Sequence, residues 1–164
     1  MPMCQQVKKE LFEKLAFVLS ESSMRCAVAE SCSGGLFADS LTDIAGSSKF
    51  FDSGLVCYSN EAKIRFLGVN EKSLIQFGAV SREVAEEMAF GTLERCGVDV
   101  AVSLTGIAGP GGGSIQKPVG LVFIGVACKN RCEVVACHFS GSRRQIKVQS
   151  VNKAVSVALE MIDI

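Results

Sequence analysis

Two long apolar runs, residues 98–104 and 119–128, most constrain what this chain can fold into. Each has the length of one β-strand, and the nearly continuous hydrophobicity of the first predicts a strand buried inside a sheet. The segment between them, residues 105–114, holds five of the 16 glycines and one of the three prolines. The sequence therefore predicts two core strands joined by a loop whose backbone can approach a ligand closely.

Helical and strand patterns alternate along the rest of the chain. Apolar residues at spacings of three and four predict a helix over residues 5–21, and a turn at 31–35 leads into a second helix. Further helices are expected at 60–68, 71–76, 82–96 and 145–161, and further strands at 25–29, 51–58 and 133–139. This order predicts an α/β fold, a single-domain sandwich over residues 1–164 with a mixed β-sheet flanked by helices.

Composition excludes several classes of function. The 17 basic and 17 acidic side chains balance, so nucleic acid is not expected as the main partner. No apolar leader or membrane-length run occurs, which predicts a soluble, cytoplasmic protein with no membrane partner, and the 48% hydrophobic content allows a homo-oligomer. The eight cysteines form no Cys-x-x-Cys pair and are expected to be reduced and mostly buried, with no metal site.

Ser31 lies in the segment 29–35, Ala-Glu-Ser-Cys-Ser-Gly-Gly, at a predicted strand-to-helix turn. In one interpretation, Ser31 or Ser33 simply caps the following helix. In the other, Ser31 is a nucleophile beside free backbone N–H groups, which could hold a substrate phosphate or stabilise an oxyanion. Cys32 offers a thiol nucleophile as a further hypothesis, although no histidine or second redox cysteine adjoins it.

A serine nucleophile needs a base, and the only histidine, His138, lies in a distant segment. A buried lysine can replace histidine once its pKa falls from about 10.4 toward 7, which requires roughly 4 to 5 kcal/mol of destabilisation of the charged form. Lys63 follows Tyr58 by five residues, and both could face the carboxyl ends of the strands, with Tyr58 relaying a proton to Ser31. The alternative is an ordinary solvated helix lysine.

The glycine loop fits neither common nucleotide motif. Its Lys117 is preceded by Gln116 rather than glycine, and no Gly-x-Gly-x-x-Gly pattern can be placed in it. A different mode of nucleotide binding and a flexible crossover both remain open for this segment.

Five segments in this order resemble the CinA C-terminal domain family over residues 8–162: 29–35, 43–48 (Asp-Ile-Ala-Gly-Ser-Ser), 58–63 (Tyr-Ser-Asn-Glu-Ala-Lys), 78–81 (Gly-Ala-Val-Ser) and 105–110 (Thr-Gly-Ile-Ala-Gly-Pro). The resemblance implies a nicotinamide-nucleotide amidase of pyridine nucleotide recycling. Such an enzyme hydrolyses nicotinamide mononucleotide to nicotinate mononucleotide and ammonia, with neither metal nor cofactor. In many members this domain follows a larger N-terminal domain, so the chain resembles the stand-alone form.

The resemblance also implies roles for individual residues. Ser31, Lys63 and Tyr58 would be catalytic, and the resemblance favours the nucleophile interpretation of Ser31 over the capping interpretation. Substrate-binding residues would be Ser33, Gly34, Gly35, Gly46, Ser47, Asn60, Thr105, Gly106 and Gly109. The phosphate could rest on N–H groups at 33–35 or 46–48, or meet Arg143 and Arg144. Family members commonly have threonine at the position of Ser33. The alternative function is a catalytically inactive nucleotide-binding or competence-linked interaction module.

Overall fold

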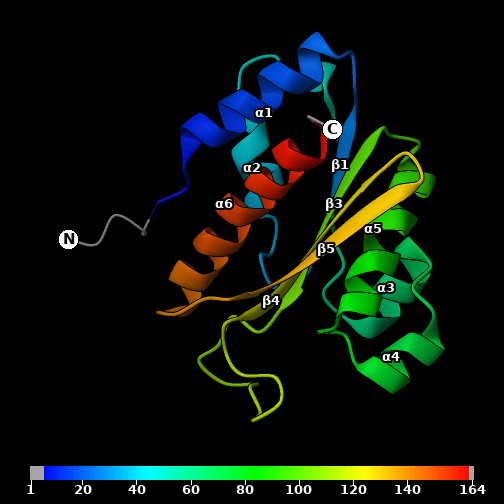
Figure 1. The fold of residues 1–164 in the computed structure, drawn as a ribbon, viewed down its shortest axis with the longest axis vertical. Helices are drawn as coiled ribbons and strands as arrows, with labels where there is room; N and C mark the ends of the chain where they lie inside the picture. The colour runs from blue at the N-terminus through cyan, green and yellow to red at the C-terminus, as the bar shows by residue number, and fades with distance from the viewer. Residues whose placement is uncertain (1–5, 163–164) are drawn as a thin grey trace.

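The computed structural model describes residues 6–162, which form a five-stranded mixed sheet with helices on both faces (Figure 1). This confirms the predicted α/β class. The strand order is β2-β1-β3-β4-β5; β1, β2 and β3 are parallel, whereas β4 and β5 continue the sheet as antiparallel strands. The strands are β1 (Cys26–Glu30), β2 (Phe51–Val56), β3 (Val100–Gly106), β4 (Leu121–Cys128) and β5 (Arg131–His138).

Two groups of helices cover the two faces of the sheet (Figure 1). One group is α1 (Lys9–Glu21), α2 (Leu36–Thr42) and α6 (Arg143–Ile162), which contact one another. The other is α3 (Asn60–Leu67), α4 (Glu71–Phe77) and α5 (Arg82–Cys96), of which α5 packs on four of the strands. The larger hydrophobic core lies under α1, α2 and α6, where the rings of Phe12 and Phe37 meet edge to face at 5.3 Å.

Burial follows the position of each strand in the sheet. Every residue of β1 is buried, as are six of the seven residues of β3, because these strands have neighbours on both sides and helices on both faces. The outermost strand β2 alternates between half-buried and exposed residues. The continuous apolar run at 98–104 therefore did predict a central strand.

Two helices begin at other residues than predicted, and side chains bind the backbone at both starts. Helix α1 begins at Lys9, and the N–H of the preceding Lys8 donates to Asn152 Oδ1 of α6 at 2.9 Å. Residue 5 of the predicted helix lies outside the described residues. Helix α6 begins at Arg143, two residues earlier than expected, where Ser142 Oγ accepts from the N–H of Gln145.

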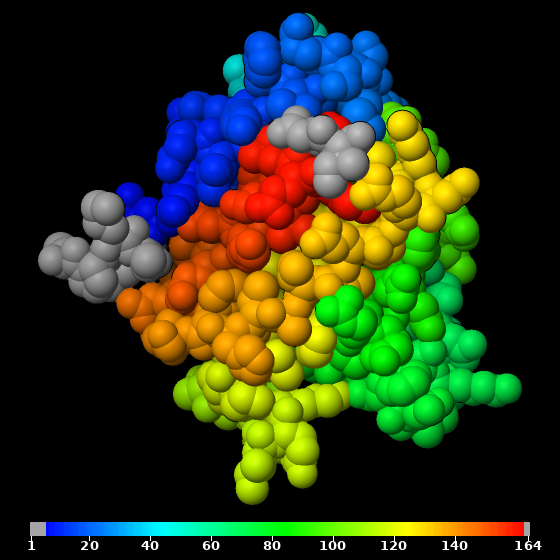
Figure 2. Space-filling view, viewed as in Figure 1, coloured from blue at the N-terminus to red at the C-terminus, as the bar shows by residue number. Residues whose placement is uncertain are grey.

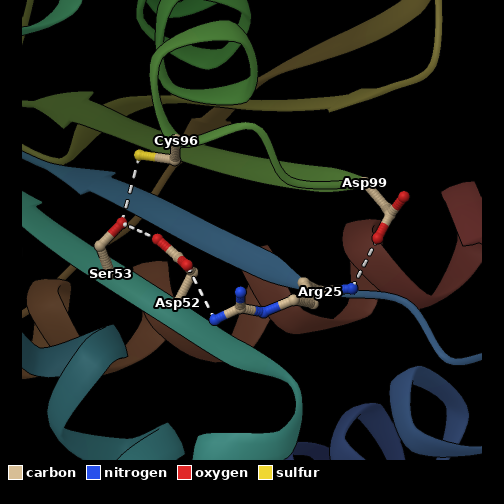
Figure 3. Close-up of polar contacts among 5 residues, drawn as sticks. All are labelled: Arg25, Asp52, Ser53, Cys96 and Asp99. Atoms are coloured by element: carbon tan, nitrogen blue, oxygen red, sulfur yellow. Dashed lines mark hydrogen bonds and ion pairs between the residues drawn. The ribbon is translucent and has the colours of Figure 1, made fainter.

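The starts of the three parallel strands are tied together by polar contacts (Figure 3). The N–H of Arg25 donates to Asp99 at 2.8 Å, and its guanidinium pairs with Asp52 at 2.8 Å. Ser53 Oγ bonds the Asp52 carboxylate and lies 3.2 Å from Cys96 Sγ at the end of α5. These contacts connect the three strands at the amino edge of the sheet. None of them involves a residue at the carboxyl edge.

The chain changes direction at β1, and this positions the site. From β1 it passes through α2 to β2 on one side, then through α3–α5 to β3 on the other side. The carboxyl ends of β1, β2 and β3 therefore meet at one edge, at the reversal of strand order where open α/β sheets bind ligands. In residues 6–162, no helix combines the length and apolar character needed to cross a bilayer, and no cluster of three metal-ligating side chains occurs.

Candidate active site

Ser31 and Lys63 meet at the carboxyl edge of the sheet. Ser31 follows β1 directly, while Lys63 lies in the first turn of α3, the helix that follows β2. Lys63 Nζ lies 3.0 Å from Ser31 Oγ, and the two residues are 9% and 1% exposed. A hydroxyl and an amine in hydrogen-bond contact, nearly closed off from water, are a possible nucleophile and base.

Burial shifts the protonation equilibrium of Lys63 toward the neutral amine. Burial lowers the pKa of Lys63, and neither of the two ion pairs found among residues 6–162 involves it. Its Nζ also contacts the carbonyl oxygens of Cys57 and Tyr58 at 2.9 and 3.1 Å. A neutral amine can donate its two N–H bonds to these carbonyls and accept the Ser31 proton with its lone pair. Lys63 is thus a buried lysine, not a solvated one.

Glu30, rather than a serine, caps the helix after the turn. Its fully buried carboxylate accepts hydrogen bonds from the N–H groups of Gly35, Phe37 and Ala38 at 3.1, 3.1 and 2.9 Å. Ser31 Oγ is bonded to Lys63 instead, and the buried Ser33 Oγ has no hydrogen-bond partner among the described residues. The capping interpretation of the two serines is therefore wrong, and a residue that the sequence analysis had not assigned to the site anchors the turn.

The backbone beside Ser31 carries N–H groups that other residues do not use. The N–H of Ser31 donates to the Leu104 carbonyl at 3.0 Å and that of Gly34 to the Ser31 carbonyl at 3.1 Å. In the described part of the chain, the N–H groups of Cys32 and Ser33 make no hydrogen bond to another residue. The N–H that follows a nucleophile in a strand-to-helix turn commonly contributes to an oxyanion hole, so that of Cys32 is the first candidate here.

Ser31 and Lys63 open into a cavity of about 270 Å³. Its walls come from the turn after β1, the segment after β2 with the first turn of α3, the segment before α5, the glycine loop and the start of α6. Thr105 helps to shape it, because its hydroxyl donates to the Ala79 carbonyl at 2.8 Å and ties two walls together. The lining residues are Ser31, Cys32, Tyr58, Lys63, Ala79, Val80, Thr105, Gly106, Ile107, Ala108, Gly109, Gly111, Gly112 and Arg143.

The side chain of Tyr58 lies at the mouth of this cavity. It is 63% exposed, and its hydroxyl accepts a hydrogen bond from Arg143 at 3.0 Å. The contact between Tyr58 and Lys63 is made through the Tyr58 backbone carbonyl. A proton relay through the Tyr58 hydroxyl stays a prediction, because in this structure that hydroxyl is bonded to Arg143.

The other residues expected in the site divide into two groups. Thr105, Gly106 and Gly109 line the cavity, whereas Ser33, Gly34, Gly35 and the exposed Asn60 lie outside its lining. Gly46 and Ser47 precede β2, whose first residue pairs with Cys26 at the start of β1. They therefore lie at the amino edge, away from Ser31, and their expected role in the site stays a prediction.

The structure supports Cys32 less well than Ser31 as a candidate nucleophile. Cys32 lines the same cavity but is 6% exposed, and burial raises the pKa of its thiol to about 11. A thiol with this pKa is almost entirely protonated at neutral pH, and the thiolate is the reactive form. Ser31, whose hydroxyl contacts the buried amine of Lys63, is the stronger candidate for the nucleophile.

Comparisons of the sequence with known proteins point to one family. A sequence model described as the CinA C-terminal domain matches residues 8–162. The chain is 47% identical over 158 residues to a protein of Enterobacter agglomerans named nicotinamide-nucleotide amidohydrolase PncC, covering 96% of both chains. It is 46% identical to a putative competence-damage inducible protein of Caldicellulosiruptor bescii, but spans only 38% of that protein's length.

Solved structures agree with this match. The competence/damage inducible protein CihA from Agrobacterium tumefaciens superposes with a TM-score of 0.92 at 39% identity, covering 100% of this chain and 98% of that one. The competence damage-inducible protein A from Klebsiella pneumoniae superposes with a TM-score of 0.93 at 32% identity, covering 96% and 98%. The chain therefore belongs to the CinA C-terminal domain family.

Proposed function

We propose that this chain is a nicotinamide-nucleotide amidase that hydrolyses the carboxamide of nicotinamide mononucleotide with Ser31 as nucleophile and Lys63 as base. The single observation that carries the proposal is the contact of 3.0 Å between Ser31 Oγ and the buried amine of Lys63, which forms no ion pair with another of residues 6–162. The name of the Enterobacter agglomerans relative, matched over nearly its whole length, supports the substrate and the reaction.

In the first half of the reaction Ser31 becomes acylated. Lys63 Nζ takes the proton from Ser31 Oγ as the oxygen attacks the carboxamide carbon, and the N–H of Cys32 faces the developing oxyanion. Collapse of the tetrahedral intermediate breaks the carbon–nitrogen bond. Lys63 then returns its proton to the leaving nitrogen, so that ammonia departs and a nicotinyl ester of Ser31 remains.

In the second half water replaces ammonia. The neutral Lys63 amine takes a proton from water, the hydroxide oxygen adds to the ester carbon, and the Ser31–acyl bond breaks. Lys63 reprotonates Ser31 Oγ, and nicotinate mononucleotide is released. The two carbonyls of Cys57 and Tyr58 hold the amine in one orientation throughout, so the same lone pair serves both steps.

Turnover of nicotinamide mononucleotide by the purified chain, followed as ammonia and nicotinate mononucleotide, tests the proposal. Removal of a general base typically costs a factor of 10² to 10⁴, so Lys63→Met should lose at least about a hundredfold in kcat, and Ser31→Ala more. Ser20→Ala and Lys72→Met change exposed residues outside the cavity and serve as matched controls. Far-ultraviolet circular dichroism establishes that each variant is folded.

A nucleophile trap distinguishes the covalent route from direct attack by water. Hydroxylamine should intercept the acyl-enzyme and yield the hydroxamate of nicotinate mononucleotide, and Ser31→Ala should form none. A folded wild type that is stabilised by the nucleotide yet releases no ammonia would refute the amidase and leave a nucleotide-binding module.

A further inference from the structure

We propose that Gly91 is a positioning residue for Lys63: because Gly91 has no side chain, α3 lies close enough to α5 to hold the Lys63 amine against Ser31 Oγ. This assignment rests on the proposed function and deepens it, since it names the residue that sets the position of the proposed base. Gly91 lies outside the lining of the cavity that contains Ser31, so it acts through α3 and not on the substrate.

Gly91 lies in the interior of α5. Of the glycines in the described part of the chain, it alone belongs to an α-helix. A glycine inside a helix destabilises that helix relative to alanine, because its backbone loses more freedom on folding. The backbone of Gly91 does not have the positive φ that would favour glycine. The reason for a glycine at this position is therefore the space that a side chain would occupy.

The carbonyl group of Leu67, the last residue of α3, fills that space. A Cβ on Gly91 would lie 1.8 Å from the Leu67 carbonyl oxygen and 2.9 Å from its carbonyl carbon, whereas real Cβ contacts essentially never fall below 3.0 Å. Both are backbone atoms, so no side-chain rotation relieves the overlap. With any larger residue at position 91, the two helices would have to separate here by about 1 Å.

Leu67 and Lys63 lie on the same side of α3. They are four residues apart, about one helical turn, and each is 1% exposed. Helix α3 packs chiefly on α5, and Figure 1 and Figure 2 show the segment from α3 to α5 together on one side of the molecule. A movement of the Leu67 carbonyl away from α5 would therefore displace this short helix, and Lys63 with it.

The contacts of the Lys63 amine leave little room for such a movement. Its Nζ lies 3.0 Å from Ser31 Oγ and 2.9 and 3.1 Å from the carbonyl oxygens of Cys57 and Tyr58. A hydrogen bond is lost by about 3.6 Å, so a displacement of about 1 Å exceeds what these contacts tolerate. Helix α5 packs on four strands, which makes it the fixed partner and α3 the helix that moves.

Gly91→Ala tests the assignment through the hydrolysis of nicotinamide mononucleotide. We expect kcat to fall about tenfold to hundredfold, the cost of misplacing a reacting group by about 1 Å, and KM to change less than about twofold because the cavity lining is untouched. The acid limb of the pH profile should move to higher pH. Separation of the helices lets water approach Lys63 and weakens the burial that lowers its pKa.

Thr92→Val is the matched control. It keeps the volume of a buried side chain next to Gly91 and removes the hydrogen bond from the Thr92 hydroxyl to the Met88 carbonyl within α5. This variant should lose stability but keep the kcat and the pH profile of the wild type. An unchanged kcat in folded Gly91→Ala, an acid limb that does not move, or an equal loss of kcat in Thr92→Val would overturn the assignment.

A second variant serves if circular dichroism shows that Gly91→Ala does not fold. Leu67→Val removes one methylene from the buried side chain of Leu67 and loosens the contact between α3 and α5 without adding an atom between them. Movement of its acid limb to higher pH supports the assignment, and a limb at the position of the wild type rejects it.

Labelling of Ser31 separates a failure of this assignment from a failure of the proposed function. Ser31 Oγ attacks the phosphorus of a fluorophosphonate and displaces fluoride, a reaction that needs the base but no nucleotide. A wild type that releases no ammonia but is labelled refutes the amidase alone. Labelling at least tenfold slower in Gly91→Ala than in wild type and Thr92→Val, measured by mass spectrometry, then supports the assignment, and equal rates overturn it. A wild type that neither hydrolyses nor labels overturns both.

Discussion

Lys63 Nζ lies 3.0 Å from Ser31 Oγ although the two residues are 32 positions apart in the chain. The contact exists because β1 and β2 are parallel neighbours, so the turn after one and the helix after the other begin at the same edge of the sheet. Lys63 lies within α3, and Ser31 directly follows the last residue of β1, so both are held by regular secondary structure. Its geometry is therefore largely formed before any substrate binds.

The rate should depend on the protonation of Lys63. Burial lowers the pKa of Lys63 below its ordinary value of 10.5, and only the neutral amine can accept the Ser31 proton. We expect kcat/KM for nicotinamide mononucleotide to fall as pH drops below this lowered pKa and to level off above it. A profile measured from pH 5 to 10 checks this, and activity that rises toward acid pH would contradict it.

The same pKa shift should appear in stability. Between the lowered pKa of Lys63 in the folded chain and its value near 10.5 in the unfolded chain, the unfolded state binds more protons. The free energy of unfolding should therefore rise with pH across this window, and the contribution is lost as pH falls through the folded pKa. Urea titrations of wild type and Lys63→Met test this, because the difference between their pH dependences isolates Lys63. A difference that does not change with pH would refute it.

The Glu30 carboxylate should make a large contribution to the free energy of unfolding. Glu30→Gln replaces a buried carboxylate that accepts three backbone N–H bonds with an amide that has a single acceptor oxygen. We expect a loss of about 2 to 4 kcal/mol in the free energy of unfolding, together with lower turnover as the Ser31 turn relaxes.

Urea denaturation measures the Glu30 effect, and Glu13→Gln is its control. Glu13 makes an exposed ion pair with Lys9, which is worth at most about 1 kcal/mol. Comparable losses in the two variants would show that the turn does not depend on the buried carboxylate.

Cys32→Ser should keep most of the activity. The thiol shares the cavity with Ser31, but its pKa of about 11, raised by burial, leaves little thiolate at neutral pH. Turnover within about threefold of wild type, with slow alkylation of Cys32 by iodoacetamide followed by mass spectrometry, is the expected result. Loss of turnover in Cys32→Ser but not in Ser31→Ala would assign the nucleophile to the thiol instead.

Most helices and strands could be predicted, because the residue patterns that define them lie within short stretches of the sequence. The helices expected at 60–68 and 82–96 are found as α3 and α5, and the hydroxyls of Ser59 and Ser81 before them accept hydrogen bonds from the N–H groups of Ala62 and Val84. The expected closeness of Ser31 and Lys63 followed from strand ends meeting at one edge. The role of Glu30 could not be predicted, because nothing in a sequence says where a carboxylate will point. The position of Gly46 and Ser47 at the amino edge could not be predicted, because a glycine turn looks the same in sequence at either edge of a sheet.

Thr105→Val should separate the shape of the cavity from the stability of the fold. The substitution keeps the volume of the side chain but removes the hydrogen bond from the Thr105 hydroxyl to the Ala79 carbonyl, which joins two cavity walls. We expect about 1 kcal/mol of lost stability and a KM raised several-fold. Thr92→Val is the matched control, since Thr92 is also buried and bonds the Met88 carbonyl within α5, outside the cavity lining. If both variants lose stability and only Thr105→Val raises KM, the Thr105–Ala79 hydrogen bond shapes the substrate site. Equal KM values in the two variants would show that the cavity keeps its shape without this bond.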